Sequence, residues 1–196
     1  MKLNQNNLYK NKYEFREEIY RSTDVLIPKK GKILFVGLDC ITDVQHYDGT
    51  RKFNVLGISK DSSKVESVKK LGIKAEVKDV LDLDEDEKFD LIWLAEEVNT
   101  LSDEEVLAIL KKANTLLNKR GFIFCDFAYR YNDGKTSMNE KGIYYRDEFS
   151  VHSLLNNANL KEEEKNMRLV TEEDKVTERW YHVLASKNLS YLLSTL

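Results

Sequence analysis

Residues that could bind a ligand or move a proton stand directly after several short apolar runs of this sequence. They are Gly37, Asp39, Asp79, Glu96 and Glu97. A carboxylate can accept hydrogen bonds from hydroxyl or amino groups, and it can take a proton from a reacting group. A glycine lets the backbone approach a ligand closely because it has no Cβ. These residue types indicate ligand binding with proton-transfer groups nearby.

The apolar runs before these residues have the length of buried strands, and helical patterns lie between them. The predicted strands span residues 32–37, 53–58, 73–78, 89–95, 121–127 and 179–186. The predicted helices span residues 8–23, 62–71, 102–117 and 147–158. Strands that alternate with helices and are apolar on both faces are typical of a mainly parallel sheet covered on both sides. We therefore predict an α/β fold.

Composition limits the classes of protein that this chain can be. Its 196 residues suit one domain, and 31 Lys and Arg against 34 Asp and Glu leave no basic excess for binding nucleic acid. The apolar runs are too short to cross a bilayer. Two distant cysteines and no signal peptide point to the cytoplasm.

The acidic segment 79–90 lacks the glycine and final glutamate of a calcium loop, so we expect no metal site.

From Lys32 to Lys187, the order of these elements resembles the class I S-adenosylmethionine-dependent methyltransferases. In that family a glycine-rich turn with three glycines follows the first strand, and here KILFVGLDCI takes its place. Gly37 matches the first glycine, whereas Asp39 and Ile41 stand at the other two, and Phe35 stands where an acidic residue is usual. A β-branched residue at such a position is costly if φ must be positive. Either the turn has another shape, or the cofactor sits differently, or it is absent.

Two further segments resemble the family's cofactor contacts. Ser59 stands where an acidic residue would bind the ribose hydroxyls, and its neutral hydroxyl makes weaker hydrogen bonds. Asp61 either substitutes for that acid or caps the following helix. Asp79 matches the segment that receives the adenine amino group. Asn159 stands at a glycine position where a left-handed turn is expected.

The resemblance implies a Rossmann-like, doubly wound, mainly parallel seven-stranded sheet with helices on both faces. We expect a helical extension at 1–30, the α/β domain at 31–187 and a tail at 188–196. The implied cofactor is S-adenosylmethionine. Its expected binding residues are Gly37, Leu38, Asp39, Ser59, Lys60, Asp61, Asp79, Val80, Ala95 and Glu96.

The candidate catalytic residues are Glu96, Glu97 and Tyr129, which follow the fourth and fifth predicted strands. Each has a simpler interpretation, since either glutamate could be a solvated residue before a helix and Tyr129 a core aromatic. The same two interpretations, a place beside the methyl acceptor or a purely structural role, apply to Asp126, Tyr144 and Tyr145. The three histidines show no metal-ligand spacing, and Cys40 has no basic neighbour that would make it a nucleophile.

Three functions are compatible with these patterns. The first is a methyltransferase acting on a small molecule or a protein, with a homodimer left open. The second is a non-catalytic domain of the same fold that binds a partner, for which the apolar tail Leu189 to Leu196 could serve. The third, a dinucleotide oxidoreductase, is disfavoured because the sequence has no G-x-G-x-x-G motif.

Overall fold

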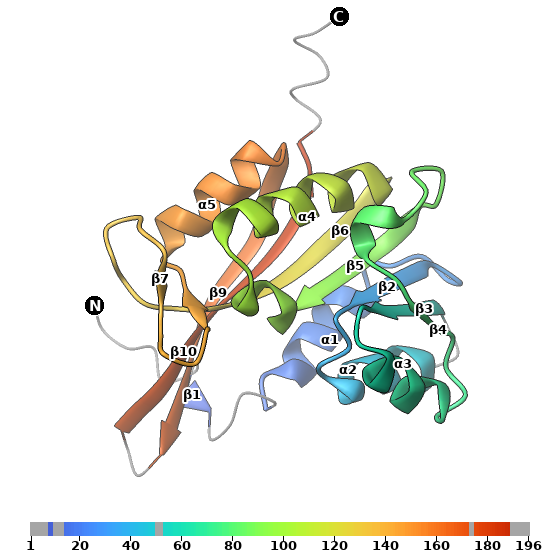
Figure 1. The fold of residues 1–196 in the computed structure, drawn as a ribbon, viewed down its shortest axis with the longest axis horizontal. Helices are drawn as coiled ribbons and strands as arrows, with labels where there is room; N and C mark the ends of the chain where they lie inside the picture. The colour runs from blue at the N-terminus through green and yellow to red at the C-terminus, as the bar shows by residue number, and fades with distance from the viewer. Residues whose placement is uncertain (1–7, 10–13, 50–52, 173–174, 189–196) are drawn as a thin grey trace, which may run out of the picture.

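The computed structural model describes residues 8–9, 14–49, 53–172 and 175–188, and Figure 1 shows their arrangement. The strands of its main sheet are β1 (Leu8–Tyr9), β2 (Lys32–Val36), β3 (Asn54–Ser59), β4 (Ala75–Val77), β5 (Phe89–Ala95), β6 (Leu117–Ala128), β9 (Leu160–Glu172) and β10 (Lys175–Lys187). A separate hairpin pairs β7 (Ser137–Met138) with β8 (Tyr144–Tyr145). The helices are α1 (Arg16–Asp24), α2 (Ile41–Gly49), α3 (Ser62–Lys69), α4 (Asp103–Leu116) and α5 (Glu148–Asn157), with 3-10 helices η2 (Val80–Asp82) and η3 (Glu96–Thr100).

The order of the strands confirms the predicted doubly wound sheet. It runs β1-β9-β10-β6-β5-β2-β3-β4. All of these except β1 form the predicted seven-stranded sheet, and the two-residue β1 adds an eighth strand at its edge. The pairs from β4 to β6 are parallel, and β10 is antiparallel to both β6 and β9. The chain winds from β2 to β4 on one side and then returns to add β5 on the other. In such a sheet, ligands bind beyond the carboxyl ends of the strands at this reversal.

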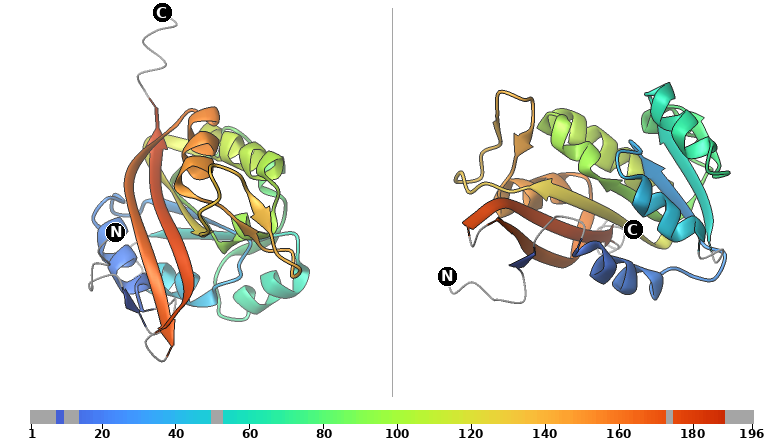
Figure 2. Two further views of the ribbon diagram at one scale, coloured as in Figure 1. Left: turned by 90° about the vertical axis from the view of Figure 1, so that its left-hand side faces the viewer. Right: turned by 90° about the horizontal axis from the view of Figure 1, so that it is seen from below.

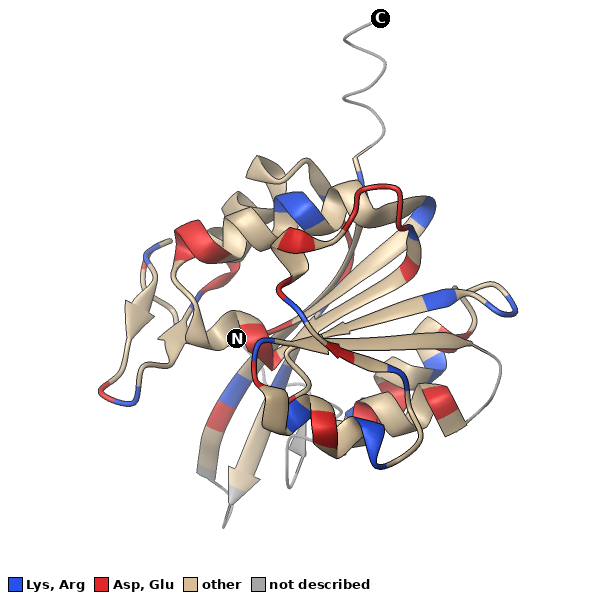
Figure 3. Ribbon diagram, turned by 45° about the vertical axis from the view of Figure 1, so that its right-hand side comes forward, with Lys and Arg blue, Asp and Glu red and all other residues tan. Residues whose placement is uncertain are grey.

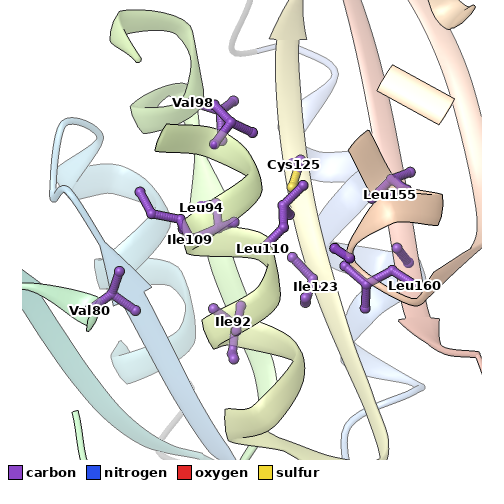
Figure 4. Packing of buried hydrophobic residues seen from close by; sticks show 14 of the residues in the cluster. Val80, Ile92, Leu94, Val98, Ile109, Leu110, Ile123, Cys125, Leu155 and Leu160 are labelled. Carbon is purple, nitrogen blue, oxygen red and sulfur yellow. The ribbon is translucent and has the colours of Figure 1, made fainter. Parts of the chain in front are cut away.

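Helices cover both faces of the sheet, as Figures 1 and 2 show. On the face of α4 and α5, the buried core includes the residues labelled in Figure 4, among them Ile92, Leu110 and Ile123. On the other face, α1, α2 and α3 pack against the side chains of Ile33, Phe35 and other strand residues. Because both faces are covered, the central strands have continuous apolar sequences.

Charged residues of both signs are spread over the helices and loops, whereas the central strands carry few of them (Figure 3). Within the part of the chain that the structure describes, no helix is long and apolar enough to cross a membrane.

Several predicted helix ends are confirmed. The Ser102 hydroxyl accepts the Glu105 N–H, while the Glu105 carboxylate accepts the Ser102 N–H over 2.8 Å, which is the predicted capping box. Gly72 after α3 has φ +82° and Asn159 after α5 has φ +55°. Both residues therefore adopt the left-handed conformation that ends these helices.

Several elements differ from the prediction. The predicted helix 8–23 is wrong in its first part, because residues 8–9 form β1 and the helix begins only at Arg16. The charged segment 160–172, which has no apolar alternation over much of its length, forms β9 because it pairs with β10 along most of its length. The turn after β2 leads into α2, a helix that we did not predict. The predicted tail 188–196 lies outside the described residues apart from Asn188.

Candidate functional site

The turn after β2 has positive φ angles at two consecutive residues. Gly37 has φ +95° and Leu38 has φ +63°, and the Gly37 N–H donates to the Ile58 carbonyl over 2.9 Å. Leu38 packs on Gly57, where a Cβ would lie 2.8 Å from Leu38 Cδ2. Ile41, which stands at a glycine position of the family turn, is instead the first residue of α2. The turn is therefore built without a positive φ at this β-branched residue.

A second unusual backbone conformation ends β5. Ala95 has φ +35° and ψ −123°, and it borders the same narrow cleft as Leu38. Non-glycine residues in such regions cost on the order of 1–3 kcal/mol each and cluster at functional sites. Two of the non-glycine residues with positive φ, Leu38 and Ala95, thus lie at the ends of β2 and β5, where the order of the strands reverses.

The carboxyl group of Glu97 lies directly over Gly37. A Cβ added to Gly37 would lie 2.3 Å from Glu97 Oε2, so the open face of this glycine is occupied by a side chain of the same protein. Burial raises the pKa of Glu97, and the Asp39 carboxyl beside it raises that pKa further. Lys64 donates to Asp39 Oδ1 over 2.5 Å, and its charge offsets part of this rise. The net effect is that Glu97 holds its proton more readily than an exposed glutamate does.

Phe35, which replaces the family's acidic residue, belongs to a cluster of buried aromatic residues. Its ring centroid lies 5.7 Å from that of Tyr47 and 5.8 Å from that of Trp93. Phe35 is 2% exposed. The substitution thus replaces a polar contact of the turn with aromatic packing beneath it.

The polar residues beyond β3 and β4 all have partners within the chain. Ser59 is buried, and its hydroxyl accepts the Asp61 N–H over 3.1 Å. Asp61 accepts the Ser63 N–H over 2.8 Å as the N-cap of α3, which is the capping role weighed above. Asp79 accepts the Leu81 N–H over 3.0 Å. Lys60 Nζ lies 3.3 Å from Asp79 Oδ2, and the Val80 side chain is buried in the core.

Little space remains between the turn and the end of β5. The cleft lined by Leu38, Asp39, Ala95, Glu96 and Glu97, together with the residues beneath them, has a volume of only about 10 Å³. That is roughly the space of one water molecule. The predicted cofactor residues are therefore brought to one edge of the sheet, but the cleft between the turn and the end of β5 is too small for a nucleoside.

A large cavity opens beside this closed region, beyond the ends of β5 and β6. Its volume is about 600 Å³, within the usual range for small-molecule sites. Among its lining residues are all three candidate catalytic residues, Glu96, Glu97 and Tyr129. Tyr145 of the β7–β8 hairpin and Trp180 of β10 form further walls. The cavity thus collects side chains from segments that are far apart in the sequence.

A buried arginine on α1 holds together the acidic residues behind this cavity. Arg16 is 2% exposed, and its guanidinium lies 2.9 Å from Asp126 Oδ2, 3.4 Å from Glu96 Oε1 and 3.7 Å from Asp43 Oδ1. Asp43 also accepts hydrogen bonds from Tyr20 and from Trp93 Nε1. Burial alone would lower the pKa of Arg16, but the carboxylates of Asp126 and Asp43 outweigh it and raise the pKa.

Two further residues that the sequence did not reveal hold the segment after β5. Asn99 donates to the Asp126 carbonyl and accepts the Ala128 N–H, each over 2.8 Å. Arg146, which is fully buried, donates to the carbonyls of Val98 and Leu101 over 2.9 and 2.7 Å. These contacts fix the cavity floor to β6 and to the segment before α5. Because these hydrogen bonds join residues that are far apart in the sequence, no local pattern could have predicted them.

The remaining sequence candidates have structural surroundings. Asp126 is 1% exposed and lies beside both Arg16 and His182, whose Nδ1 is 3.0 Å from Asp126 Oδ1. Tyr144 lies against the Arg146 guanidinium, 5.5 Å from its ring centroid. Burial raises the pKa of the Cys40 thiol to about 11, which disfavours a thiolate. Within the described residues, no group of His, Cys, Asp and Glu could hold a metal ion.

Comparison with known proteins rests on structure alone, because no family model and no curated protein matches the sequence. A SAM-dependent methyltransferase from Methanosarcina mazei superposes with a TM-score of 0.69 at 11% identity, covering 86% of this chain and 97% of that one. A SAM-dependent methyltransferase from Leishmania major gives 0.68 at 14% identity, covering 88% and 72%. The chain has the methyltransferase fold.

The same fold occurs in magnesium protoporphyrin IX methyltransferase from Synechocystis, whose structure contains bound SAH. Its TM-score is 0.66 at 11% identity, covering 89% of this chain and 81% of that one. In a methyltransferase fold, the reversal between β2 and β5 is the position expected for a ligand. In this chain that position is divided into the closed cleft around Gly37 and the 600 Å³ cavity beside it.

Proposed function

We propose that this chain is an S-adenosylmethionine-dependent methyltransferase whose methyl acceptor binds in the 600 Å³ cavity. The observation that carries this proposal is the placement of that cavity. It lies beyond the reversal of the strand order, beside two strained strand ends, and it is lined by all three candidate catalytic residues. A fold alone does not determine a reaction, so the argument depends on this site.

The backbone around Gly37 fits S-adenosylmethionine once a single side chain moves. The turn has its positive φ angles at Gly37 and Leu38. The two atoms nearest to a Cβ at Gly37 belong to the carboxyl group of Glu97, and the third is the Glu97 Cβ at 3.1 Å. Rotation of the Glu97 carboxyl group away from Gly37 would remove the two nearest of these atoms. The turn from Gly37 to Asp39 would then hold the methionine part, while Ser59, Asp79 and their neighbours would face the nucleoside. The cofactor supplies an electrophilic methyl group when it is bound.

The chain's own residues would orient the acceptor and remove its proton. Glu97 has a raised pKa, which makes its carboxylate a better proton acceptor near neutral pH. Glu96 is held by Arg16 over 3.4 Å, so it positions the acceptor rather than exchanging protons. Tyr129 and Tyr145 form apolar walls that keep water away from the reacting atoms.

The closed cleft favours a second candidate function, that of a non-catalytic domain which binds a partner. Under this alternative, Glu97 stays over Gly37 and the ion pairs Asp39–Lys64 and Asp79–Lys60 replace the cofactor contacts. A small-molecule or protein acceptor, a homodimer and the division into 1–30, 31–187 and 188–196 are further parts of our proposal. Both cysteines in the structure are free, which supports placing the protein in the cytoplasm.

Calorimetric titration with S-adenosylhomocysteine separates the two functions. Measurable binding, weakened by Asp79→Ala, supports the methyltransferase. Asp79→Ala keeps the fold if its far-ultraviolet spectrum matches that of the parent protein. If neither heat nor a thermal shift is seen at millimolar ligand, the chain does not use this cofactor and the non-catalytic function stands.

A further inference from the structure

We propose that a second cavity, which lies between α1 and the strands β9 and β10, binds a small neutral phenol whose hydroxyl group donates a hydrogen bond to Nε2 of His182. This site is separate from the one proposed for methyl transfer, because the two cavities share no lining residue. The proposal rests on the volume and lining of the second cavity, on the buried imidazole in its wall and on the partners of its other polar groups.

The second cavity is large enough for an aromatic ring. Its volume is about 300 Å³, which lies at the lower end of the usual range for small-molecule sites. Its apolar walls come from three elements, with Ile19 on α1, Phe124 on β6 and Leu184 on β10. A planar apolar ligand would bury its surface against these side chains, and such burial is favourable.

One polar group in this wall, the imidazole of His182, is buried and has a nitrogen without a partner. His182 is 4% exposed. Its Nδ1 lies 3.0 Å from Asp126 Oδ1, whereas its Nε2 has no hydrogen-bond partner among the residues that the structure describes. A buried acceptor that makes no hydrogen bond is costly to the folded state. A ligand that donates to Nε2 would remove this cost.

His182 stands between Asp126 and the cavity. His182 is paired with Asp126 across β10 and β6, and with Asn166 across β10 and β9. Asn166 and His182 both line the cavity, but Asp126 does not. Because Nε2 is itself buried, a hydroxyl group reaches it only when the cavity wall shifts slightly, and the hydrogen bond is then shielded from water.

The tautomer of His182 decides which ligand chemistry fits. In a neutral imidazole one nitrogen donates a hydrogen bond and the other accepts one. The carboxyl group of Asp126 beside Nδ1 favours the proton on that nitrogen, which leaves Nε2 as the acceptor. The ligand must therefore bring a donor, and a neutral hydroxyl group does so without carrying a charge against apolar side chains. Together with the apolar walls, this requirement favours a phenol.

The other polar side chains around this cavity have partners within the chain. Ser22 and Thr23 both donate to the Ile19 carbonyl, over 2.9 and 2.8 Å. Arg168 Nη2 lies 3.0 Å from Glu18 Oε2. The remaining contacts are those of Asn166 with Glu164 and of Lys165 with Glu148. A ligand with a single hydroxyl group leaves all of these contacts intact, and it gives Nε2 of His182 a partner.

The test compares phenol with toluene, which has a methyl group in place of the hydroxyl group. Calorimetry measures the affinity of the full chain for each probe, and the ratio of the two affinities is compared between the parent protein and His182→Leu. We expect the variant to lower the preference for phenol on the order of tenfold, as the loss of a hydrogen bond in a buried site would. The same ratio in both proteins, or no binding of phenol to the parent protein at millimolar concentration, would overturn the proposal.

A matched variant separates this contact from a general effect of removing a histidine. His152→Leu makes the same change at an exposed residue of α5, and it should leave the ratio of affinities unchanged. If His152→Leu lowers the preference for phenol as much as His182→Leu does, the hydroxyl group is not recognised by His182 and the proposal is wrong.

A second measurement needs no change at His182 and therefore does not depend on the folding of a variant. The chain has three histidines, so a protein labelled with nitrogen-15 histidine gives few imidazole signals, and His46→Gln and His152→Gln assign two of the residues. Phenol should shift the signal of Nε2 of His182 much further than toluene does, because only phenol donates a hydrogen bond. Equal shifts with both probes would show that the hydroxyl group does not contact His182.

Discussion

The site has two halves, a closed half around Gly37 and Asp79 and an open half around Glu96 and Tyr129. In the closed half the cleft measures about 10 Å³, because Glu97 covers Gly37 and the polar side chains beyond β3 and β4 bind one another. In the open half the cavity measures about 600 Å³, and its lining comes from segments far apart in the sequence. The chain's own side chains thus fill one half and leave room for a ligand in the other.

Glu97 belongs to both halves, since it covers Gly37 and also lines the cavity. Movement of this one side chain would therefore enlarge the closed half and alter the charge of the open one. Substitutions that change one half without the other test whether the two halves are distinct.

The largest expected effect comes from Arg16, which supports the floor of the open half. Arg16→Met removes the guanidinium that Asp43, Glu96 and Asp126 share, so buried carboxylates lose their counter-charge. We expect a loss of about 3 kcal/mol in the free energy of unfolding by urea denaturation. Arg130→Met, a matched change at an exposed arginine, should cost less than about 0.5 kcal/mol. A loss of under about 1 kcal/mol for Arg16→Met would mean that the cluster is not held by this charge.

Gly37→Ala tests whether Glu97 fills the closed half. The new Cβ would lie 2.3 Å from Glu97 Oε2 at a residue with φ +95°, and we expect a loss of about 2 kcal/mol in the free energy of unfolding. Gly72→Ala is the matched control, because Gly72 has φ +82° with no atom within 4 Å of the added Cβ. It should show only the backbone strain, about 1 kcal/mol.

A double-mutant cycle isolates the contact between these two residues. In the Glu97→Ala background, Gly37→Ala should cost less than in the parent protein, since the obstructing carboxyl is gone and only the Cβ of residue 97, 3.1 Å from the added Cβ, remains. If the cost of Gly37→Ala is the same in both backgrounds, Glu97 does not occupy the face of the glycine.

The sequence predicted β2 to β6 and β10, because each of them contains a short apolar run, whereas the two-residue β1 and the charged β9 lack one. It did not reveal the support behind them. Arg16 looks like one solvated residue of an amphipathic segment, and its contact with Glu96 crosses 80 positions of the chain. No local pattern reports a contact at that distance.

The open half was harder to predict than the closed half for the same reason. Its far wall comes from the start of β10, where residues 176–180 lie beside the end of β6. The partner strand β9 is rich in charge, and antiparallel edge strands with one solvated face need not look apolar. The sequence could place Glu96, Glu97 and Tyr129 at strand ends, but it could not show that they border one cavity.

Glu97→Ala should open the closed half. Without the carboxyl group over Gly37, binding of S-adenosylhomocysteine should tighten by on the order of tenfold, or about 1.4 kcal/mol. Glu97→Gln keeps the bulk of the side chain, so it should leave this affinity close to that of the parent protein. If calorimetry shows the same affinity for Glu97→Ala and Glu97→Gln, the Glu97 side chain does not close the cleft.

The pH dependence of stability gives the smallest and most specific test. Burial and Asp39 raise the pKa of Glu97 above its ordinary value of 4.5. Between the unfolded and the folded pKa, the native protein binds more protons at this residue than the unfolded chain does. The contribution of Glu97 to stability is therefore fully present below pH 4.5 and is lost as the pH rises through the folded pKa.

Glu97→Gln removes this term and leaves the other ionisable groups in place. The free energy of unfolding of the parent protein minus that of the variant should therefore decline as the pH rises above 4.5, where a carboxylate with a lowered pKa would give the opposite slope. Urea denaturation of both proteins at matched ionic strength measures this difference. A flat difference would mean that Glu97 is solvated, and a solvated Glu97 could not close the cleft over Gly37.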